Sequence, residues 1–422
     1  MKNKTLILIL FLAFILRLGV NLYLGIDALP DRQACGADAV EFEELAWNVA
    51  SGHGYTLNGN STAFRAPGFP FMIAAIYKIF GRNYLAFHIF NIFVSTSCCY
   101  ILYLLTFRVT LFPKTALWAT FVLAVMPLQV YYSGHYLSEN LAIFFSLLTT
   151  YMVVLAVSNK NVSIKLIFLS GLFNGISILI RPVALLYIAF LGLVAIFWGK
   201  LKFIKIVYLG IIFCLGTFIV MAPWTYRNYK AFNRLSLVAS NGGSTFWGSN
   251  NEIVAEPGDS WGTWISTGFA GELKKREVLS LSNEIDRDKK EWALGKKYIK
   301  ENKEKIPMLI LGKYYRLISP FPVTKNRLFM LLVAIGYFGI VPLAVFGVIL
   351  SLKDRDHIFK FYPIIAQFIV LFICTGIFYG SARFRSVYEP FFIIYAAIAL
   401  SHIQDILVVK LKGESNGAKK KS

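Results

Sequence analysis

The sequence predicts an all-α polytopic membrane protein with about ten transmembrane helices. Of its 422 residues, 57% are hydrophobic and 16% aromatic, with a mean hydropathy of +0.59. These values exceed what a soluble domain carries. The charged residues, 16% of the chain, gather in the connections between long apolar runs. This pattern is typical of helices that cross a bilayer, since each needs about 20 largely apolar residues.

The apolar runs define the expected spans. They are residues 5–26, 84–106, 115–133, 138–157, 164–181, 182–199, 204–222, 327–351, 361–379 and 388–406. The first run has a basic start, like a signal peptide, but no small-residue cleavage site follows it. We therefore expect it to be an uncleaved span.

Lysine and arginine in short connections mark the cytoplasmic side of a membrane protein. With this set of spans, one side receives Lys2 and Lys4, Arg108 and Lys114, Lys160 and Lys165, Lys200, Lys202 and Lys205, Lys353, Arg355 and Lys360, and Lys419, Lys420 and Lys421. We expect a multi-pass protein of the plasma (inner) membrane with both termini in the cytoplasm. The net charge of +20 is then mostly a topology signal that also favours anionic membrane lipids. No nucleic-acid partner is expected, because no basic face of a soluble domain is evident.

The chain divides into four expected parts. Residues 1–222 form a transmembrane catalytic module of seven spans, interrupted by a first external loop at residues 27–83. Residues 223–325 form a second external segment, 326–406 a module of three spans, and 407–422 a polar cytoplasmic tail.

The first external loop is expected to contain helices that lie at the membrane interface. The apolar residues that follow Asp38 have helical spacing, which predicts a helix that begins there and lies on the membrane. Prolines make the stretch from Phe64 to Pro70 a stiff turn. The apolar piece that follows, ending near Phe80, is too short to span and is read as an interfacial or re-entrant helix. In the second external segment we expect a charged helix at 283–305 and an apolar run at 308–318.

Two acids near the external ends of the spans are candidate catalytic residues. Asp38 is the candidate general base, because a partly desolvated carboxylate there could take a proton from an acceptor hydroxyl. Its alternative role is to cap the helix. Glu139 opens the fourth span, where an ionisable residue is costly and therefore suggests function, although it could also serve the first helical turn. Glu41, Glu43 and Glu44 are read mostly as solvated surface charge.

Five arginines fall in external turns and suit a bound phosphate. They are Arg65, Arg181, Arg227, Arg383 and Arg385. Guanidinium groups stay charged and grip phosphate with two parallel hydrogen bonds. The alternative is that they reach lipid headgroups. Arg383 and Arg385 flank Phe384, and an extended turn would point both guanidinium groups the same way and Phe384 towards lipid.

No metal site is predicted. His135 lies one helical turn before Glu139, and a site made with Asp38 is conceivable. However, no paired ligand spacing supports it. A divalent metal is possible but not indicated, and no other cofactor is expected.

A series of short motifs resembles a known family when it is read in order. The motifs are Asp38 with Phe42 and Leu45-Ala46, Gly52-His53-Gly54-Tyr55, Arg65-Ala66-Pro67-Gly68-Phe69-Pro70, Ser138-Glu139, Arg181-Pro182, Pro223-Trp224-Thr225-Tyr226-Arg227-Asn228, and Arg383-Phe384-Arg385 with Glu389-Pro390. This order resembles the membrane glycosyltransferases of the dolichyl-phosphate-mannose protein mannosyltransferase superfamily, which includes the aminoarabinose transferase of lipid A. Asp38 is followed by Ala39, where the protein mannosyltransferases pair an Asp with a Glu, which argues against a eukaryote-like protein mannosyltransferase.

The resemblance implies the class C glycosyltransferase fold and a sugar donor carried on polyprenyl phosphate. It implies that Asp38 is the base, that Glu139 orients the sugar or the acceptor, and that Arg65, Arg383 and Arg385 contact the donor phosphate. Arg181 and Arg227 remain further candidates from the charge pattern.

The function expected from the sequence is inverting transfer of a sugar to a cell-envelope glycan, lipid or protein on the external membrane face. A single displacement with a phosphate leaving group inverts the anomeric carbon, unlike the two-carboxylate retaining route. One alternative is a transporter or flippase of lipid-linked glycans, but such proteins usually carry repeats and ionisable residues near the midplane. The other is a glycan ligase or polymerase that uses a lipid diphosphate.

Overall fold

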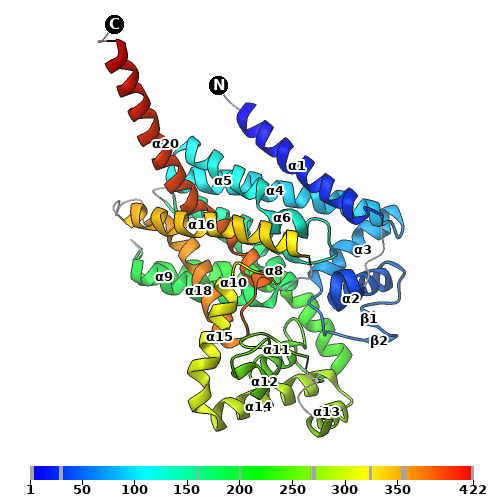
Figure 1. The fold of residues 1–422 in the computed structure, drawn as a ribbon. Helices are drawn as coiled ribbons and strands as arrows, with labels where there is room; N and C mark the ends of the chain where they lie inside the picture. Colours follow the sequence, from blue (N-terminus) through cyan, green and yellow to red (C-terminus); the bar gives the residue numbers. More distant parts are fainter. Residues whose placement is uncertain are drawn as a thin grey trace.

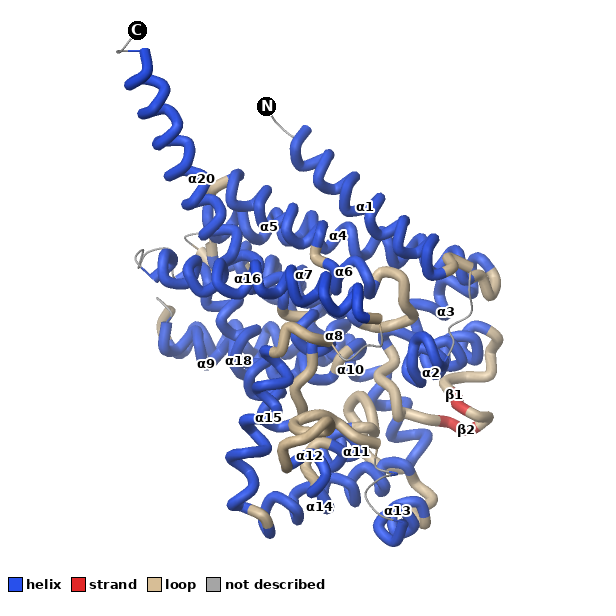
Figure 2. Tube along the Cα trace, viewed as in Figure 1, coloured by secondary structure: helices blue, strands red, loops and turns tan. Residues whose placement is uncertain are grey.

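The structure is a computed structural model, and it describes residues 4–27, 32–158, 161–198, 201–266, 268, 272–322, 326–352 and 359–419. It is a bundle of helices with a smaller, mostly helical segment at one end (Figures 1 and 2). The bundle is built around one large apolar core, to which the faces of α4, α7, α18 and α20 contribute.

Six helices are long and apolar enough to cross a membrane among the described residues. They are α1 (Lys4–Leu24), α4 (Tyr84–Thr110), α7 (Glu139–Val157), α10 (Phe203–Phe232), α16 (Arg327–Leu352) and α20 (Glu389–Lys419). The remaining predicted spans correspond to shorter apolar helices of 13 to 17 residues. These are α5 (Pro113–Val125), α8 (Ile164–Ile180), α9 (Leu185–Trp198), which follows the short η1 (Pro182–Ala184), and α18 (Tyr362–Ile377). The all-helical class is confirmed, whereas the count of about ten spans is not.

The third predicted span is broken, because α5 ends at Val125 and a separate α6 (Pro127–Tyr132) follows. Pro127 disfavours the helical conformation at the preceding residue, and Met126 is extended there with a ψ of 116°. The break frees carbonyl groups at the end of α5. Arg17 of α1, which is only 1% exposed, donates to two of them, Ala124 O at 3.1 Å and Leu123 O at 3.4 Å.

Helix α10 is longer than its predicted span, which was expected to end at residue 222. It continues through Pro223 to Phe232 because the change from apolar to polar residues marks the end of the apolar run and not the end of the helix. Arg227 therefore lies on a helix and not in a loop. Helix α20 likewise continues past the predicted boundary at 406.

The first external loop contains a helix, a hairpin and a second helix. Helix α2 (Arg32–Ala50) begins before Asp38, so the expectation that Asp38 starts this helix is wrong. A tight hairpin follows, formed by β1 (Thr56–Leu57) and β2 (Asn60–Ser61). Its Asn58-Gly59 turn has positive φ at both residues, a signal that was present in the sequence. Helix α3 (Gly68–Phe80) is the short apolar helix that the sequence predicted.

The second external segment packs its helices against one another and against the first loop. Its helices are α11 (Gly242–Gly248), α12 (Glu252–Ala255), α13 (Glu272–Leu279), α14 (Glu284–Glu301), η3 (Lys303–Lys305) and α15 (Ile306–Ile318). Trp292 of α14 stacks on Phe246 with ring centroids 4.4 Å apart. Glu284 accepts hydrogen bonds from Ala63 N at 2.5 Å and from Thr62 Oγ1 at 3.0 Å, which ties the segment to the first loop.

The N-terminal end of α1 and the C-terminal part of α20 lie at one end of the molecule, and α12 to α14 lie at the opposite end (Figure 1). If the lysine-rich connections are cytoplasmic, both exposed glycines Gly59 and Gly258 must face outward. We expect a cysteine placed at either position, in a chain without native cysteines, to react with a membrane-impermeant maleimide in intact cells.

Lys165→Cys is the matched control, since it should react only after the cells are opened. Labelling of position 258 only in opened cells would contradict this orientation.

Candidate active site

The centre of the candidate site is Asp38, which is held between two arginines. Its Oδ1 lies 2.6 Å from Arg65 Nη2, and its Oδ2 lies 2.6 Å from Arg383 Nη1. The Asp38 side chain is 27% exposed, so it is half-buried but open to an incoming group. Residues far apart in the sequence therefore meet at one carboxylate.

Glu139 joins the same cluster from the first turn of α7. Its Oε1 accepts from Arg181 Nη2 at 2.5 Å and from Arg383 Nε, so that Arg383 bridges the two acids. The Glu139 side chain is fully buried, and its second oxygen has no hydrogen-bond partner in the described structure. A buried carboxylate is tolerated here because two guanidinium groups compensate its charge.

The chain that leads into α3 places Arg65. Its Nε donates to Glu41 Oε2 at 2.7 Å, and its guanidinium lies over the ring of Phe64, 5.1 Å from the centroid. The loop sits close to the end of α8, because a Cβ at Gly68 would come 2.9 Å from the Leu179 backbone carbonyl. Only glycine permits this approach, which brings Arg65 towards Arg181.

Arg383 projects from α19 (Ala382–Ser386), a short helix capped by Ser381, whose Oγ accepts from Phe384 N at 3.1 Å. The expectation of an extended turn is therefore wrong. Successive helical residues turn by about 100°, so Arg383 and Arg385 point to different places. Phe384 does not face lipid as expected. It lines a cavity, and its ring centroid lies 4.4 Å from that of Tyr379.

Arg385 is not brought into the cluster. It is 1% exposed, its Nη1 donates to Leu317 O at 2.6 Å and Ser319 O at 2.7 Å, and its Nε donates to Glu389 Oε1 at 3.1 Å. Its guanidinium also lies 3.6 Å from the centroid of the Tyr337 ring. These contacts hold α19 against the end of α15.

Arg227 also lies outside the cluster. It donates to Thr62 O at 2.7 Å and Tyr55 O at 2.9 Å, and it lies over the Trp224 ring at 4.9 Å. It therefore fixes the chain on either side of the hairpin to α10. Of the five predicted arginines, the structure brings together Arg65, Arg181 and Arg383.

Burial of Asp38 would by itself raise the pKa of its carboxyl. The charges of Arg383 and Arg65 outweigh this effect, aided by the hydrogen bond from Arg383 and by Arg181, and the pKa lies below its ordinary value of 3.8. Asp38 is therefore a carboxylate at neutral pH.

Two acids of α2 were misread as solvated surface charge. Glu41 pairs with Arg65, as described above. Glu43 is 5% exposed and binds Arg82 through both carboxylate oxygens at 2.8 Å. Helical spacing was the available signal, since residues three apart share a face and Glu41 follows Asp38 by three. In the described part of the chain no group of three or more His, Cys, Asp or Glu side chains could hold a metal, and His135 Nδ1 lies 2.9 Å from Tyr131 O.

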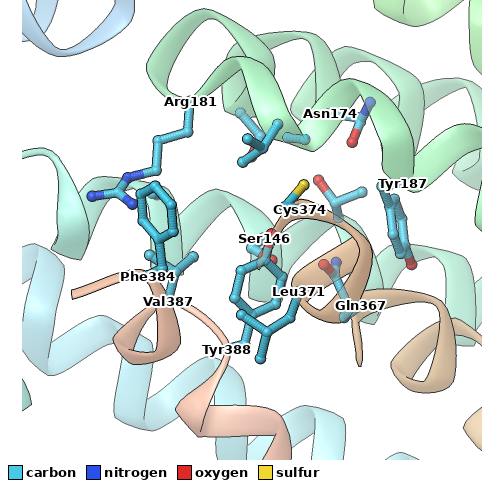
Figure 3. A pocket seen from close by; sticks show the side chains of 15 residues that line it. Ser146, Asn174, Arg181, Tyr187, Gln367, Leu371, Cys374, Phe384, Val387 and Tyr388 are labelled. Carbon is cyan, nitrogen blue, oxygen red and sulfur yellow. The ribbon is translucent and has the colours of Figure 1, made fainter. Parts of the chain in front are cut away.

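A cavity extends from Arg181 and Phe384 into the bundle between α7, α8, α9 and α18 (Figure 3). Its volume is about 30 Å³, so it is a narrow cavity. Its walls are mostly apolar, and its inner part carries polar side chains from three helices. They are Ser146 and Thr149, Asn174 and Ser177, and Gln367.

Residues 64–224 match the dolichyl-phosphate-mannose-protein mannosyltransferase family. This range includes Arg65, Glu139 and Arg181, while Asp38 and Arg383 lie outside it. No curated protein sequence matches the chain.

The fold is similar to that of the oligosaccharyltransferase AglB from Archaeoglobus fulgidus. The complex of that protein with an inhibitory peptide and a dolichol-phosphate has a TM-score of 0.58 at 14% identity, over 98% of this chain and 52% of that one. The form tethered to an acceptor peptide has a TM-score of 0.59 at 14% identity, over 97% of this chain and 50% of that one. The chain thus spans about half the length of these structures.

A weaker likeness is to ArnT from Cupriavidus metallidurans bound to undecaprenyl phosphate. It has a TM-score of 0.46 at 9% identity, over 95% of this chain and 79% of that one. The fold shared with AglB is the class C glycosyltransferase fold, and within this chain residues 64–224 are similar to the dolichyl-phosphate-mannose-protein mannosyltransferases.

Proposed function

We propose that the protein is an inverting glycosyltransferase that moves a sugar from a polyprenyl-phosphate carrier to a cell-envelope glycan, lipid or protein on the external face of the plasma membrane. The observation that carries this proposal is the cluster in which Arg65 and Arg383 hold Asp38 while Arg181 and Arg383 hold Glu139. It combines a candidate base with candidate phosphate ligands at the external mouth of the bundle. The family match and the fold support the proposal.

In the proposed reaction Asp38 takes the proton from an acceptor hydroxyl. The acceptor oxygen forms a bond to the anomeric carbon, while the bond from that carbon to the phosphate oxygen breaks. The leaving group is polyprenyl phosphate, whose developing charge is stabilised by guanidinium groups in place of a general acid. Arg383 and Arg181 are placed for this role, and Arg383 is 33% exposed at the mouth.

The position of the charges favours an enzyme over a transporter. The cluster lies at the ends of helices and includes Asp38 and Arg65 of the first external loop, whereas transporters place ionisable groups near the midplane. A ligase or polymerase that uses a lipid diphosphate is distinguished by its donor. We expect the purified protein to consume a polyprenyl-monophosphate sugar and not the diphosphate form. Mass spectrometry of envelope glycans, lipids and proteins from a deletion strain should then identify the acceptor that loses one sugar.

The pH dependence of kcat/KM reports the free enzyme's base. Because Arg383 and Arg65 keep the pKa of Asp38 below 3.8, its active carboxylate form is lost only as the pH falls through that lower value. We expect kcat/KM to show no acid limb from Asp38 between about pH 7 and 5. An acid limb in that range that shifts in Asp38→Glu would contradict the lowered pKa of Asp38, although Asp38 would remain the base.

A further inference from the structure

A second cavity, with a volume of about 630 Å³, lies where α4 ends, α5 begins and α16 ends, and α20 forms one of its sides. Figure 1 shows the start of α5 beside α20, towards the end of the molecule that carries both termini. At 1.5 Å per residue, Asp405 in this cavity is about 24 Å along α20 from Glu389, the residue that adjoins α19. The cavity is therefore remote from the Asp38 cluster. Its volume lies within the 300–1,000 Å³ of small-molecule sites.

The cavity carries one positive and one negative side chain. Lys114 Nζ of α5 lies 2.5 Å from Asp405 Oδ1 of α20, and the two side chains are 34% and 70% exposed. An exposed ion pair of this kind contributes little to stability. The pair can therefore open at small cost to a ligand that brings both an anionic and a cationic group.

Two hydroxyl groups in the cavity lack partners. Thr115 and Ser401 both line it and are only 2% and 8% exposed, yet neither side chain makes a hydrogen bond in the described part of the chain. Thr115 lies in the first turn of α5, whose N-cap residue Phe112 supplies no side-chain cap. The first N–H groups of a helix lack intrahelical partners and favour an anion. Together with the Lys114 ammonium group, they suit a phosphate.

We propose that this cavity binds one membrane phospholipid whose headgroup carries both a phosphate and a primary ammonium group, as in phosphatidylethanolamine. The phosphate is met by Lys114 and the start of α5, and the ammonium group donates to Asp405 and to the Ser401 hydroxyl. An anionic headgroup without an amine would bring its charge towards the Asp405 carboxylate. A choline headgroup has the positive charge but no N–H to donate.

The rest of the lining suits the apolar part of a lipid. Val109, Phe361 and Ile398 give the cavity apolar walls, and the exposed ring of Phe112 lies at its open side. The cavity is formed at the ends of helices, which in a membrane protein is the level of the headgroups. A lipid can thus enter from the leaflet on that side. The proposal does not depend on the proposed function, because it involves neither the sugar donor nor the Asp38 cluster.

The test titrates the purified full-length protein in detergent with phosphatidylethanolamine, phosphatidylcholine and phosphatidylglycerol of identical acyl chains, and measures bound lipid by native mass spectrometry. We expect phosphatidylethanolamine to bind at least about tenfold more tightly than the other two. Lys114→Gln should weaken its binding about tenfold, the size of a lost charged hydrogen bond. Asp405→Asn should weaken it similarly but should not weaken binding of phosphatidylglycerol.

The matched control is Lys305→Gln. Lys305 also forms an exposed pair with a carboxylate, Glu256 Oε1 at 2.8 Å, but it lies in the second external segment and does not line the cavity. It should bind all three lipids as the wild type does. An equal loss in this control and in Lys114→Gln would overturn the proposal.

Two further outcomes would also overturn the proposal. Equal affinity for the three lipids, unchanged in Lys114→Gln and Asp405→Asn, would mean that lipids cover this surface without a headgroup site. Soluble phosphoethanolamine should bind at least about tenfold more weakly than the lipid, because it leaves the apolar part of the cavity empty. Equal binding of the two would assign the cavity to a free phosphate compound and not to a lipid.

Discussion

Asp38→Asn is expected to lower the rate of sugar transfer by about 10²–10⁴-fold, the contribution of a positioned general base. The amide keeps the shape of the side chain but cannot take the acceptor's proton. Donor binding should be kept or become tighter, because Arg65 and Arg383 lose the carboxylate that each contacts at 2.6 Å and remain available to phosphate. The measurement is single-turnover transfer from a labelled polyprenyl-phosphate sugar, together with the donor affinity of the same preparation.

Glu44→Gln is the matched control for this variant. Glu44 lies on the same helix, α2, but accepts a hydrogen bond from Asn58 N at 2.8 Å outside the cluster. It should retain transfer at close to the wild-type rate. Near-normal turnover of a folded Asp38→Asn protein would require another base.

Arg383→Lys is expected to weaken use of the donor, whereas Arg385→Lys is expected to lower the stability of the protein. Lysine at 383 keeps the charge but cannot bridge Asp38 and Glu139 with a planar fork or bind phosphate with two parallel bonds. We expect the KM for the donor to rise about tenfold or more, the size of a lost charged hydrogen bond. The KM for the acceptor should change little. Titration of the donor at fixed acceptor, and the reverse, measures both.

In Arg385→Lys the expected loss is of stability. The variant removes a guanidinium group that donates hydrogen bonds to Leu317 O, Ser319 O and Glu389 Oε1 and lies over the Tyr337 ring. The midpoint of thermal unfolding in detergent should fall, while the folded fraction keeps the wild-type dependence on donor concentration. Equal effects of the two variants on donor KM would show that Arg385 also reaches the phosphate.

The apolar runs predicted the helices well because hydrophobicity over many residues is a strong signal. Local backbone events were not predicted. The span at 115–133 is split because Pro127 excludes the helical conformation at Met126, and α10 runs on through Pro223 although its sequence becomes polar there. The hairpin at Asn58-Gly59 carried a recognisable turn signal.

The acids and three arginines of the cluster were recognisable from their positions in the connections between apolar runs, but their pairing was not. Which guanidinium group meets which carboxylate depends on how α2, α7 and α19 pack, and spacing along the chain does not specify that. The two arginines beside Phe384 illustrate the limit. A turn of only five residues can be extended or helical, and the helix of α19 sends Arg385 into the protein and Arg383 to the site.

Through the contacts of Arg17, the first helix, α1, stabilises the rest of the bundle as well as crossing the membrane. An anchor that only holds a protein in the membrane could be exchanged for any apolar helix of the same length. Here an exchanged helix would leave the Ala124 and Leu123 carbonyls without the donor that now reaches them. Each orphaned carbonyl costs about 1–3 kcal/mol, and Ser95, which now accepts from Arg17 Nε at 2.7 Å, would lose its partner too. A foreign apolar helix fused in place of α1 would therefore insert the chain into the membrane. It would not supply a hydrogen-bond donor to the carbonyl groups at the end of α5.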